Sequence, residues 1–422
     1  MRKTVLAVLM ALVALCVSAM AEETAEEWVK KGDELFAAGS IDEALQAWDK
    51  ALQIYNEIIE QNPQDVKVLI EKVELLDRKA ELKNGDARKE TLHIIDKALE
   101  LDSNSSESWY HKGKSLYYLG ITGYPIQERE TVFVDAVKAF DKAIEIDPIN
   151  FQVWFERGFV VLQWGSLDEW MGKHDESQNK WEESLKSCDK AIEILNQTAK
   201  TDLKNFEGLL WWMKGFNLYQ LGQYTEALHA CNKAIELDFM GGWDVKARTL
   251  SELGMHNESL DAFNNSQYPL SITRKGMLLL ALGNNDMALD TFNQAVEVSP
   301  DYVKAWEGKG TALARLGRHE DSAKAYEKAL ARHDENIRQH PKDAKVWTDR
   351  GDFLYKIGMY DVAIDSFDKA IDIYPEFSPA WQGKGDALKA IGRNLEADMA
   401  FTKARELGYN VSLKNLLYGP TL

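Results

Sequence analysis

The sequence contains only three cysteines, Cys16, Cys188 and Cys231. Cys16 falls in an apolar N-terminal segment, so two cysteines remain for the folded part of the chain. Two are too few for the disulfide framework that stabilises many small secreted domains. We therefore expect Cys188 and Cys231 to be free buried thiols, and we expect packing, not cross-linking, to stabilise the chain.

Positive charge is also scarce in this sequence. The chain has 50 Lys and Arg against 68 Asp and Glu, which gives a formal net charge of -18. An acidic surface repels the phosphates of nucleic acids and of anionic lipids. The composition therefore argues against nucleic acid as a partner.

No catalytic or metal-binding motif stands out. The eight histidines are scattered along the chain, and there is no glycine-rich loop of the kind that binds phosphate. The segment DSNSSE, which starts at Asp102, lacks the glycine at the sixth place and the glutamate at the twelfth place of a calcium-binding loop. We therefore expect a protein without enzymatic activity, without a metal site and without a cofactor.

Residues 1–21 have the pattern of a secretory signal. A basic start at Arg2 and Lys3 precedes an apolar run, and the small-x-small ending Ala19-Met20-Ala21 follows it. We predict cleavage after Ala21 and a secreted or extracytoplasmic protein with no membrane insertion after cleavage. The alternative is an uncleaved segment that tethers the protein to a membrane, although the apolar run is shorter than the roughly 20 residues that span a bilayer.

The rest of the chain repeats one pattern. The segments AWEGKGTALARLGRHEDSAKAYEKAL from Ala305, VWTDRGDFLYKIGMYDVAIDSFDKAI from Val346 and AWQGKGDALKAIGRNLEADMAFTKA from Ala380 share one frame. In this frame a Trp is followed four residues later by Gly, then by Leu and a second Gly, and then by a small residue, an aromatic residue and Ala. Trp347 and Trp381 are 34 residues apart.

This frame resembles the tetratricopeptide repeat, a unit of two antiparallel helices with 34 residues in total. The resemblance covers nearly all of the chain after the signal and implies an all-α fold: a right-handed superhelical solenoid of about ten helix-turn-helix units. We expect the Gly four residues after the Trp to let two helices approach closely, and the Trp to be buried between units.

The frame divides the chain into units of unequal regularity. Insertions at 121–132 and 166–180 lengthen the connections inside units three and four, and we expect them to be loops. They indicate either a local structure with a purpose or tolerated drift. The predicted organisation is a signal peptide (1–21), units one and two with unit two degenerate (25–108), units three to five (109–239), a short degenerate unit six (240–271), units seven to ten (272–409) and a C-terminal tail or cap (410–422).

Aromatic residues that the frame does not explain gather on one stripe. Positions one, five and eight after the Trp lie on one face of a helix, and the family resemblance implies that this face lines a concave groove that binds peptides. The stripe is aromatic only in units three to five, and Tyr124 and Trp170 of the insertions are candidates for a wall beside it. The candidate groove residues are Tyr110, Lys114, Tyr117, Phe155, Phe159, Trp212, Phe216 and Tyr219.

Two functions fit these observations. The first is a non-enzymatic scaffold that binds a peptide or protein segment in the concave groove, within an envelope or secretion assembly. The second is an extracytoplasmic receptor for a glycan or small apolar ligand stacked on the stripe, unless the insertions bury it. The Lys and Asn pair by which some family members hold a peptide's terminal carboxylate is absent. Five sequons are candidate glycosylation sites, at Asn104, Asn196, Asn257, Asn264 and Asn410.

Overall fold

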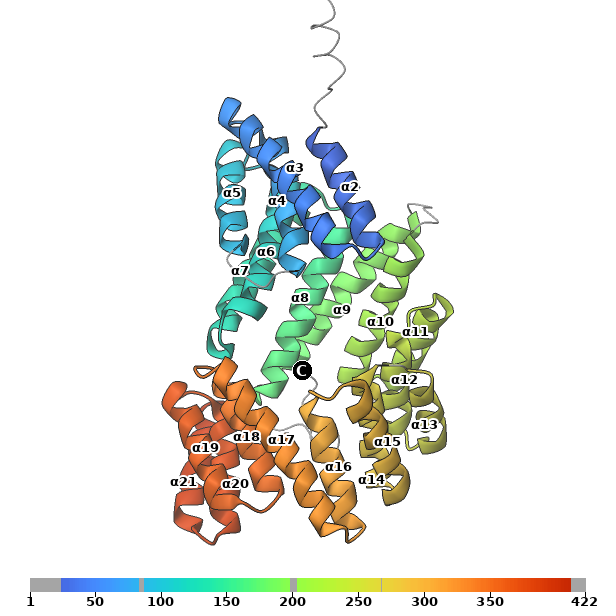
Figure 1. Ribbon diagram of the computed structural model, residues 1–422, viewed down its shortest axis with the longest axis vertical. Coiled ribbons are helices and arrows are strands. Elements are labelled where there is room, and N and C mark those ends of the chain that lie inside the picture. Colours follow the sequence, from blue (N-terminus) through green and yellow to red (C-terminus); the bar gives the residue numbers. More distant parts are fainter. Residues whose placement is uncertain (1–23, 83–86, 198–202, 267, 411–422) are drawn as a thin grey trace, which may run out of the picture. The chain divides into compact units, whose positions relative to one another are not determined.

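Twenty helices follow one another in the part of the chain that the structure describes (Figure 1). The structure is a computed structural model that describes residues 24–82, 87–197, 203–266 and 268–410. The helices form ten consecutive pairs: α2 (Ala25–Ala37) and α3 (Ile41–Gln61), α4 (Val66–Leu82) and α5 (Ala87–Leu101), α6 (Ser106–Gly123) and α7 (Ile126–Ile146), α8 (Phe151–Trp170) and α9 (His174–Gln197), α10 (Lys204–Gln220) and α11 (Tyr224–Glu236), α12 (Gly241–Glu252) and α13 (His256–Asn264), α14 (Pro269–Ala281) and α15 (Asn285–Val298), α16 (Val303–Arg315) and α17 (His319–Gln339), α18 (Ala344–Lys356) and α19 (Tyr360–Ile373), and α20 (Ser378–Ala390) and α21 (Asn394–Glu406).

The predicted all-α array of about ten helix pairs is confirmed. Within the described ranges the only β-type pairing is an isolated bridge between Lys173 and Asn410. The chain divides into two compact units, the N-terminal unit Met1–Ser115 and the C-terminal unit Leu116–Leu422. The predicted signal at 1–21 lies outside the described residues, as does the predicted tail apart from Asn410. None of the helices in the described ranges has the length and hydropathy that a membrane-spanning segment requires.

Glycine allows helices of two neighbouring pairs to pack directly against the same aromatic ring. Phe367 of α19 is fully buried. A β-carbon added to Gly351 in the same pair would lie 2.6 Å from its ring, and one added to Gly383 in the next pair would lie 2.5 Å from it. Phe292 is enclosed in the same way by Gly276 and Gly308. The expected role of the small residue after the Trp is therefore confirmed.

The tryptophans of the frame are less buried than expected. In four pairs the indole N–H donates to the carbonyl oxygen of the proline six residues earlier, at distances of 2.8 to 3.2 Å, from Trp154, Trp306, Trp347 and Trp381. Each of these rings therefore covers the turn between two consecutive pairs and stays half-exposed. The expectation that the Trp of the frame is buried between units is also wrong for Trp211, the Trp of unit five. Its ring is half-buried, with the Nζ of Lys214 5.4 Å from its centre.

The two insertions are helical, which corrects the prediction of loops. The first insertion extends α6 to Gly123 and begins α7 at Ile126, with only a short break between them. The second extends α8 to Trp170, so that α8 has 20 residues, whereas α16 has 13. The turn that follows contains Gly172, whose φ of 75° favours glycine. The extra residues therefore lengthen two helix pairs by whole turns.

The lengthened α8–α9 pair reaches the C-terminal helices of the same unit, as Figure 1 shows for α8 and α18. The ring of Trp170 packs 5.0 Å from that of Phe377, and the hydroxyl of Ser378 donates to the carbonyl oxygen of Met171 at 2.7 Å. The backbone N–H of Asn410 donates to the carbonyl oxygen of Gly172 at 2.6 Å. We call residues 168–173 the α8–α9 tip. Trp170 therefore does not line the aromatic groove, and the proposed wall is wrong at this residue.

The structure also places the cysteines, unit two and the asparagines of the sequons. Cys188 and Cys231 are buried and free, as expected. Unit two, judged degenerate, still forms the regular pair α4 and α5. The asparagines of all five sequons are exposed, so their glycosylation stays a prediction.

Candidate functional site: the Trp212 pocket

The structure separates the candidate groove residues into covered and accessible ones. Tyr110 and Lys114 are half-buried on the part of α6 that belongs to the N-terminal unit. The other six lie in the C-terminal unit, where Phe159 and Trp212 are half-buried and four are buried: Tyr117, Phe155, Phe216 and Tyr219. Much of the predicted stripe is therefore part of the core.

Neighbouring helices cover the buried aromatics. Tyr117 lies between Phe133 of α7 and Phe159 of α8, with ring centres 5.9 and 5.8 Å away. The ring of Phe206, near the start of α10, is nearly perpendicular to that of Phe155, and the two ring centres are 5.6 Å apart. Tyr124, the other proposed wall residue, is half-buried at the turn between α6 and α7. The stripe of units three and four is thus a packing surface between successive pairs.

An open pocket remains farther along the C-terminal unit. Trp212 and Phe216 of α10 line a cavity of about 400 Å³ together with Leu162 of α8. Phe239, which follows α11, lies 5.9 Å from the Trp212 ring. Residues of α12 and α14 complete the lining. We call this cavity the Trp212 pocket, and its walls are mainly apolar and aromatic.

Charged residues form one side of the Trp212 pocket. A guanidinium nitrogen of Arg274 donates to Asp244 at 2.6 Å, and the Ser271 hydroxyl donates to the same carboxylate at 2.7 Å. Burial raises the pKa of Asp244, but Arg274 and Arg248 lower it more, so the net shift is downward. Asp244 is therefore ionised at neutral pH and is held by Arg274.

Arg248 is the second cation of the pocket. It is only 2% exposed, and its guanidinium lies 4.3 Å from the ring centre of Tyr219 and 5.5 Å from that of Phe216. Its Nε–H has no hydrogen-bond partner. A buried N–H of this kind normally has an acceptor. Since Arg248, Arg274 and Asp244 together carry one net positive charge, the pocket suits a ligand with a carboxylate or another anionic oxygen.

Sequence reasoning missed these charged residues for an identifiable reason. The aromatic stripe ends at unit five, and unit six has polar residues in the same register. The same positions one, five and eight after Trp243 are Asp244, Arg248 and Ser251. The register that identified Trp212 would therefore have found Arg248 as well.

A larger hollow, of about 720 Å³, lies along α20 and α21. It includes Leu395 and Met399, which are 82% and 73% exposed. The positions 34 residues earlier, Asp361 and Asp365, are also exposed although a further helix pair follows them, so this side of the array stays open. We do not propose this hollow as the ligand site, because none of the described residues that line it is a buried polar residue.

The architecture belongs to the class of helical repeat proteins, in which antiparallel helix pairs bury their apolar faces on their neighbours. Profiles described as Tetratricopeptide repeat match residues 273–337 and 320–376, 208–239, and 35–65. The matched segments, which together make up less than half of the chain, are therefore repeats of the tetratricopeptide repeat family. Proteins of this family generally mediate interactions between proteins.

Several known proteins are similar in sequence to segments of this chain. An Hsp70-Hsp90 organizing protein from Triticum aestivum is 27% identical over 206 residues, which cover 47% of this chain and 35% of the relative. The TPR repeat-containing protein MJ0940 from Methanocaldococcus jannaschii is 29% identical over 121 residues, covering 27% and 38% of the two chains. The chain thus spans little more than a third of these relatives. The crystal structure of yeast Tom70 aligns over 91% of this chain and 85% of its own, with 15% identity and a TM-score of 0.43.

Proposed function

We propose that this protein is a non-enzymatic scaffold that binds a segment of another protein in the Trp212 pocket. One observation carries the proposal: an open pocket with aromatic walls contains a buried arginine whose Nε–H has no acceptor. Aromatic rings and arginine are the residues that most often dominate binding energy at protein interfaces. The general role of the family supports a protein or peptide as the partner.

The proposed segment carries an apolar or aromatic side chain next to an acidic group. The side chain packs on Trp212, Phe216 and Phe239, and the carboxylate accepts from Arg248. Because Arg248 is buried, this pair of charges is screened less by salt than a surface pair. The wheat relative is named for Hsp70 and Hsp90, but this chain lacks the Lys and Asn pair expected of a chaperone-tail site, so we do not propose those partners.

A receptor for a glycan or small apolar ligand is the second candidate. The volume of about 400 Å³ favours it, since it falls within the range of roughly 300–1,000 Å³ typical of small-ligand sites. The two candidates differ in the residues that they contact, because a protein segment continues past the pocket and a small ligand does not.

The test is a selection of peptides from a random display library on the full chain. Selected peptides are then measured by fluorescence anisotropy against three variants. Trp212→Ala should weaken binding by about 30-fold or more, as removal of an interface anchor does. Trp347→Ala is the matched control, because this half-buried tryptophan lies outside the pocket and its loss should leave affinity unchanged.

The third variant, Arg248→Met, tests the acidic group. Replacing the peptide's Glu or Asp by its amide should weaken binding to the natural chain but not to Arg248→Met. Equal binding to Trp212→Ala and the natural chain would contradict the proposal. Saturable quenching of Trp fluorescence by a sugar or an apolar ligand, with no peptide selected, would favour the second candidate.

We also propose that the protein acts outside the cytoplasm, within an envelope or secretion assembly. The basis is the signal pattern of residues 1–21. Amino-terminal sequencing of exported protein should find Glu22 as the first residue. Retention of Met1 in a membrane fraction would instead support the tethered form.

A further inference from the structure

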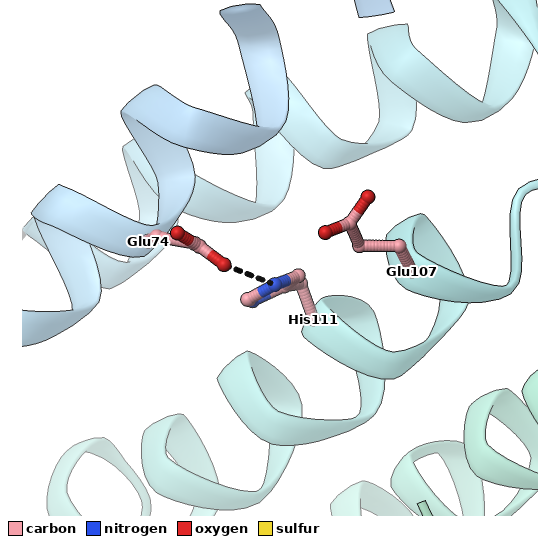
Figure 2. A group of neighbouring side chains, drawn as sticks. All are labelled: Glu74, Glu107 and His111. Carbon is pink, nitrogen blue, oxygen red and sulfur yellow. Dashed lines mark ion pairs between the residues drawn. The ribbon is translucent and has the colours of Figure 1, made fainter. Parts of the chain in front are cut away.

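Acidic side chains surround a buried histidine in the N-terminal unit. Glu107 and His111 stand one turn apart on α6, and Glu74 projects toward His111 from α4, as Figure 2 shows. One ligand atom from each of these three residues lies within 4.8 Å of the others. The Nε2 atom of His111 is 3.7 Å from a carboxylate oxygen of Glu74. Together with Asp77, we call these residues the His111 cluster.

Asp77 approaches the same imidazole from its other nitrogen. It lies one turn after Glu74 on α4, and its Oδ2 atom is 3.6 Å from the Nδ1 atom of His111. Asp77 and His111 are each only 5% exposed, and neither carboxylate oxygen of Asp77 nor His111 Nδ1 has a hydrogen-bond partner. Burying a carboxylate that accepts no hydrogen bond raises the free energy of the folded state. The Asp77 carboxylate therefore lies buried beside the imidazole of His111 without a hydrogen bond that satisfies it.

We propose that Glu74, Glu107 and His111 bind a divalent metal ion, with Zn²⁺ the best fit, and that Asp77 positions His111. Imidazole nitrogen and carboxylate oxygen are both zinc ligands, whereas Ca²⁺ and Mg²⁺ are bound by oxygen. A metal-bound histidine almost always donates its second N–H to a carboxylate or another acceptor, which holds the ring in place. Asp77 is placed to accept this bond from Nδ1, which leaves Nε2 for the metal.

The distances are compatible with this assignment. Two ligands of a tetrahedral zinc, each about 2.1 Å from the metal, are about 3.4 Å apart. The 3.7 Å between His111 Nε2 and Glu74 is close to this value. Glu107 is exposed, so its side chain has the freedom to close on the ion. A water molecule would take the fourth position.

Charge and access around the His111 cluster also favour a cation. Glu74 borders a cavity of about 300 Å³ that also contains Glu26, Tyr55 and Arg78. Arg78 lies at 2.6 Å from Asp33, so that carboxylate offsets its charge. Burial and the neighbouring glutamates raise the pKa of Tyr55 to about 12, as expected in a negative local potential. Four carboxylates (Glu26, Asp33, Glu71 and Glu74) and two cations (Lys30 and Arg78) line this cavity, so its net charge is negative beside Glu74.

The competing state is a protonated His111 between two carboxylates. Burial lowers the pKa of His111, but Asp77 and Glu74 raise it more, and the net shift is upward. In that state the cluster is a structural ion pair, and a metal ion has no role. The two states make opposite predictions for the binding of zinc.

The test is a calorimetric titration of Zn²⁺ into the untagged full chain after removal of metals by a chelator. We expect saturation at one ion per chain. His111→Gln should abolish this binding, and Glu74→Gln and Glu107→Gln should weaken it at least tenfold. Asp77→Asn should weaken it by about 10- to 100-fold, the usual effect of losing the carboxylate behind a metal-bound histidine.

Glu100→Gln is the matched control, because it removes the same charge from an exposed position on α5 in the same unit. It should leave zinc binding unchanged. Glu107 is exposed, so Glu107→Gln should fold even if a change at buried His111 does not, and circular dichroism checks this. The absence of zinc binding by the natural chain would overturn the proposal, as would equal binding by Glu107→Gln. A zinc-induced rise in melting temperature that Glu107→Gln lacks would support it.

Discussion

The contact made by the α8–α9 tip can be tested by Trp170→Ala. Trp170 is only 7% exposed, its ring lies against Phe377, and the Nζ of Lys345 is 5.0 Å from its centre. Removing a large buried aromatic usually costs about 3 to 5 kcal/mol. Of this, the aromatic pair accounts for about 0.5 to 1.5 kcal/mol and the cation–π contact for about 0.5 to 1 kcal/mol.

The loss should appear as opening of the tip and not as unfolding of the array. In repeat proteins each pair is stabilised mainly by its neighbours, and Trp170 touches helices that are distant in sequence. A loss of about 3 to 5 kcal/mol corresponds to a shift of about 150- to 5,000-fold in the equilibrium between docked and undocked tip. The helix pairs themselves should stay folded.

The backbone amide of Asn410 reports directly on this equilibrium, because it donates to Gly172. Trp170→Ala should speed its hydrogen exchange by about 150-fold or more, the lower end of that range. Amides inside α16 and the helical circular dichroism should not change, and Trp306→Ala is the matched control. Unchanged exchange at Asn410 would refute the reasoning, and so would global loss of helix.

Three further predictions concern single side chains. Gly383→Ala should destabilise the chain by about 1 to 3 kcal/mol in urea unfolding, since its β-carbon would press on the ring of Phe367. Burial raises the pKa of Asp168 to about 7 in the folded protein, whereas an Asp in an unfolded chain has a pKa of about 3.9. Between these values unfolding releases a proton, so the free energy of unfolding should fall as pH rises from about 4 to 7. The melting temperature of Asp168→Asn should lack this dependence. Trp211→Ala and Trp212→Ala should lower the melting temperature by similar amounts, because both rings are half-buried, and only Trp212→Ala should weaken peptide binding.

The repeat architecture was predictable from the sequence because its determinants are local. A glycine in one helix and an aromatic residue in the next recur at fixed spacing, and Gly351 and Phe367 meet as this spacing implies. The same local reasoning failed for the long insertions. Their residues continue the helices on either side, but a repeat frame gives no position for surplus residues between two helices and so predicts a loop there.

The α8–α9 tip was not predictable for a different reason. Trp170 and Phe377 are 207 residues apart, and neither belongs to a recurring position that would connect them. A repeat pattern fixes how each pair meets the next one, but it does not specify contacts between distant pairs. Trp170 lies in an insertion and has no place in the repeat frame, so its contact with Phe377 follows only from the arrangement of the helix pairs in space.

The Trp212 pocket shows how far a helical register determines a site. The register placed Trp212 and Phe216 on one face of α10, but whether that face is open depends on the next connection. Here Phe239 packs against Trp212, and α12 begins at Gly241, where a β-carbon would lie 2.6 Å from Phe239 and 3.1 Å from Trp212. The absence of that side chain leaves room for the two rings beside the pocket. The shortness of unit six, read in the sequence as degeneration, thus coincides with the one place where the aromatic stripe stays open beside a buried arginine in the described chain.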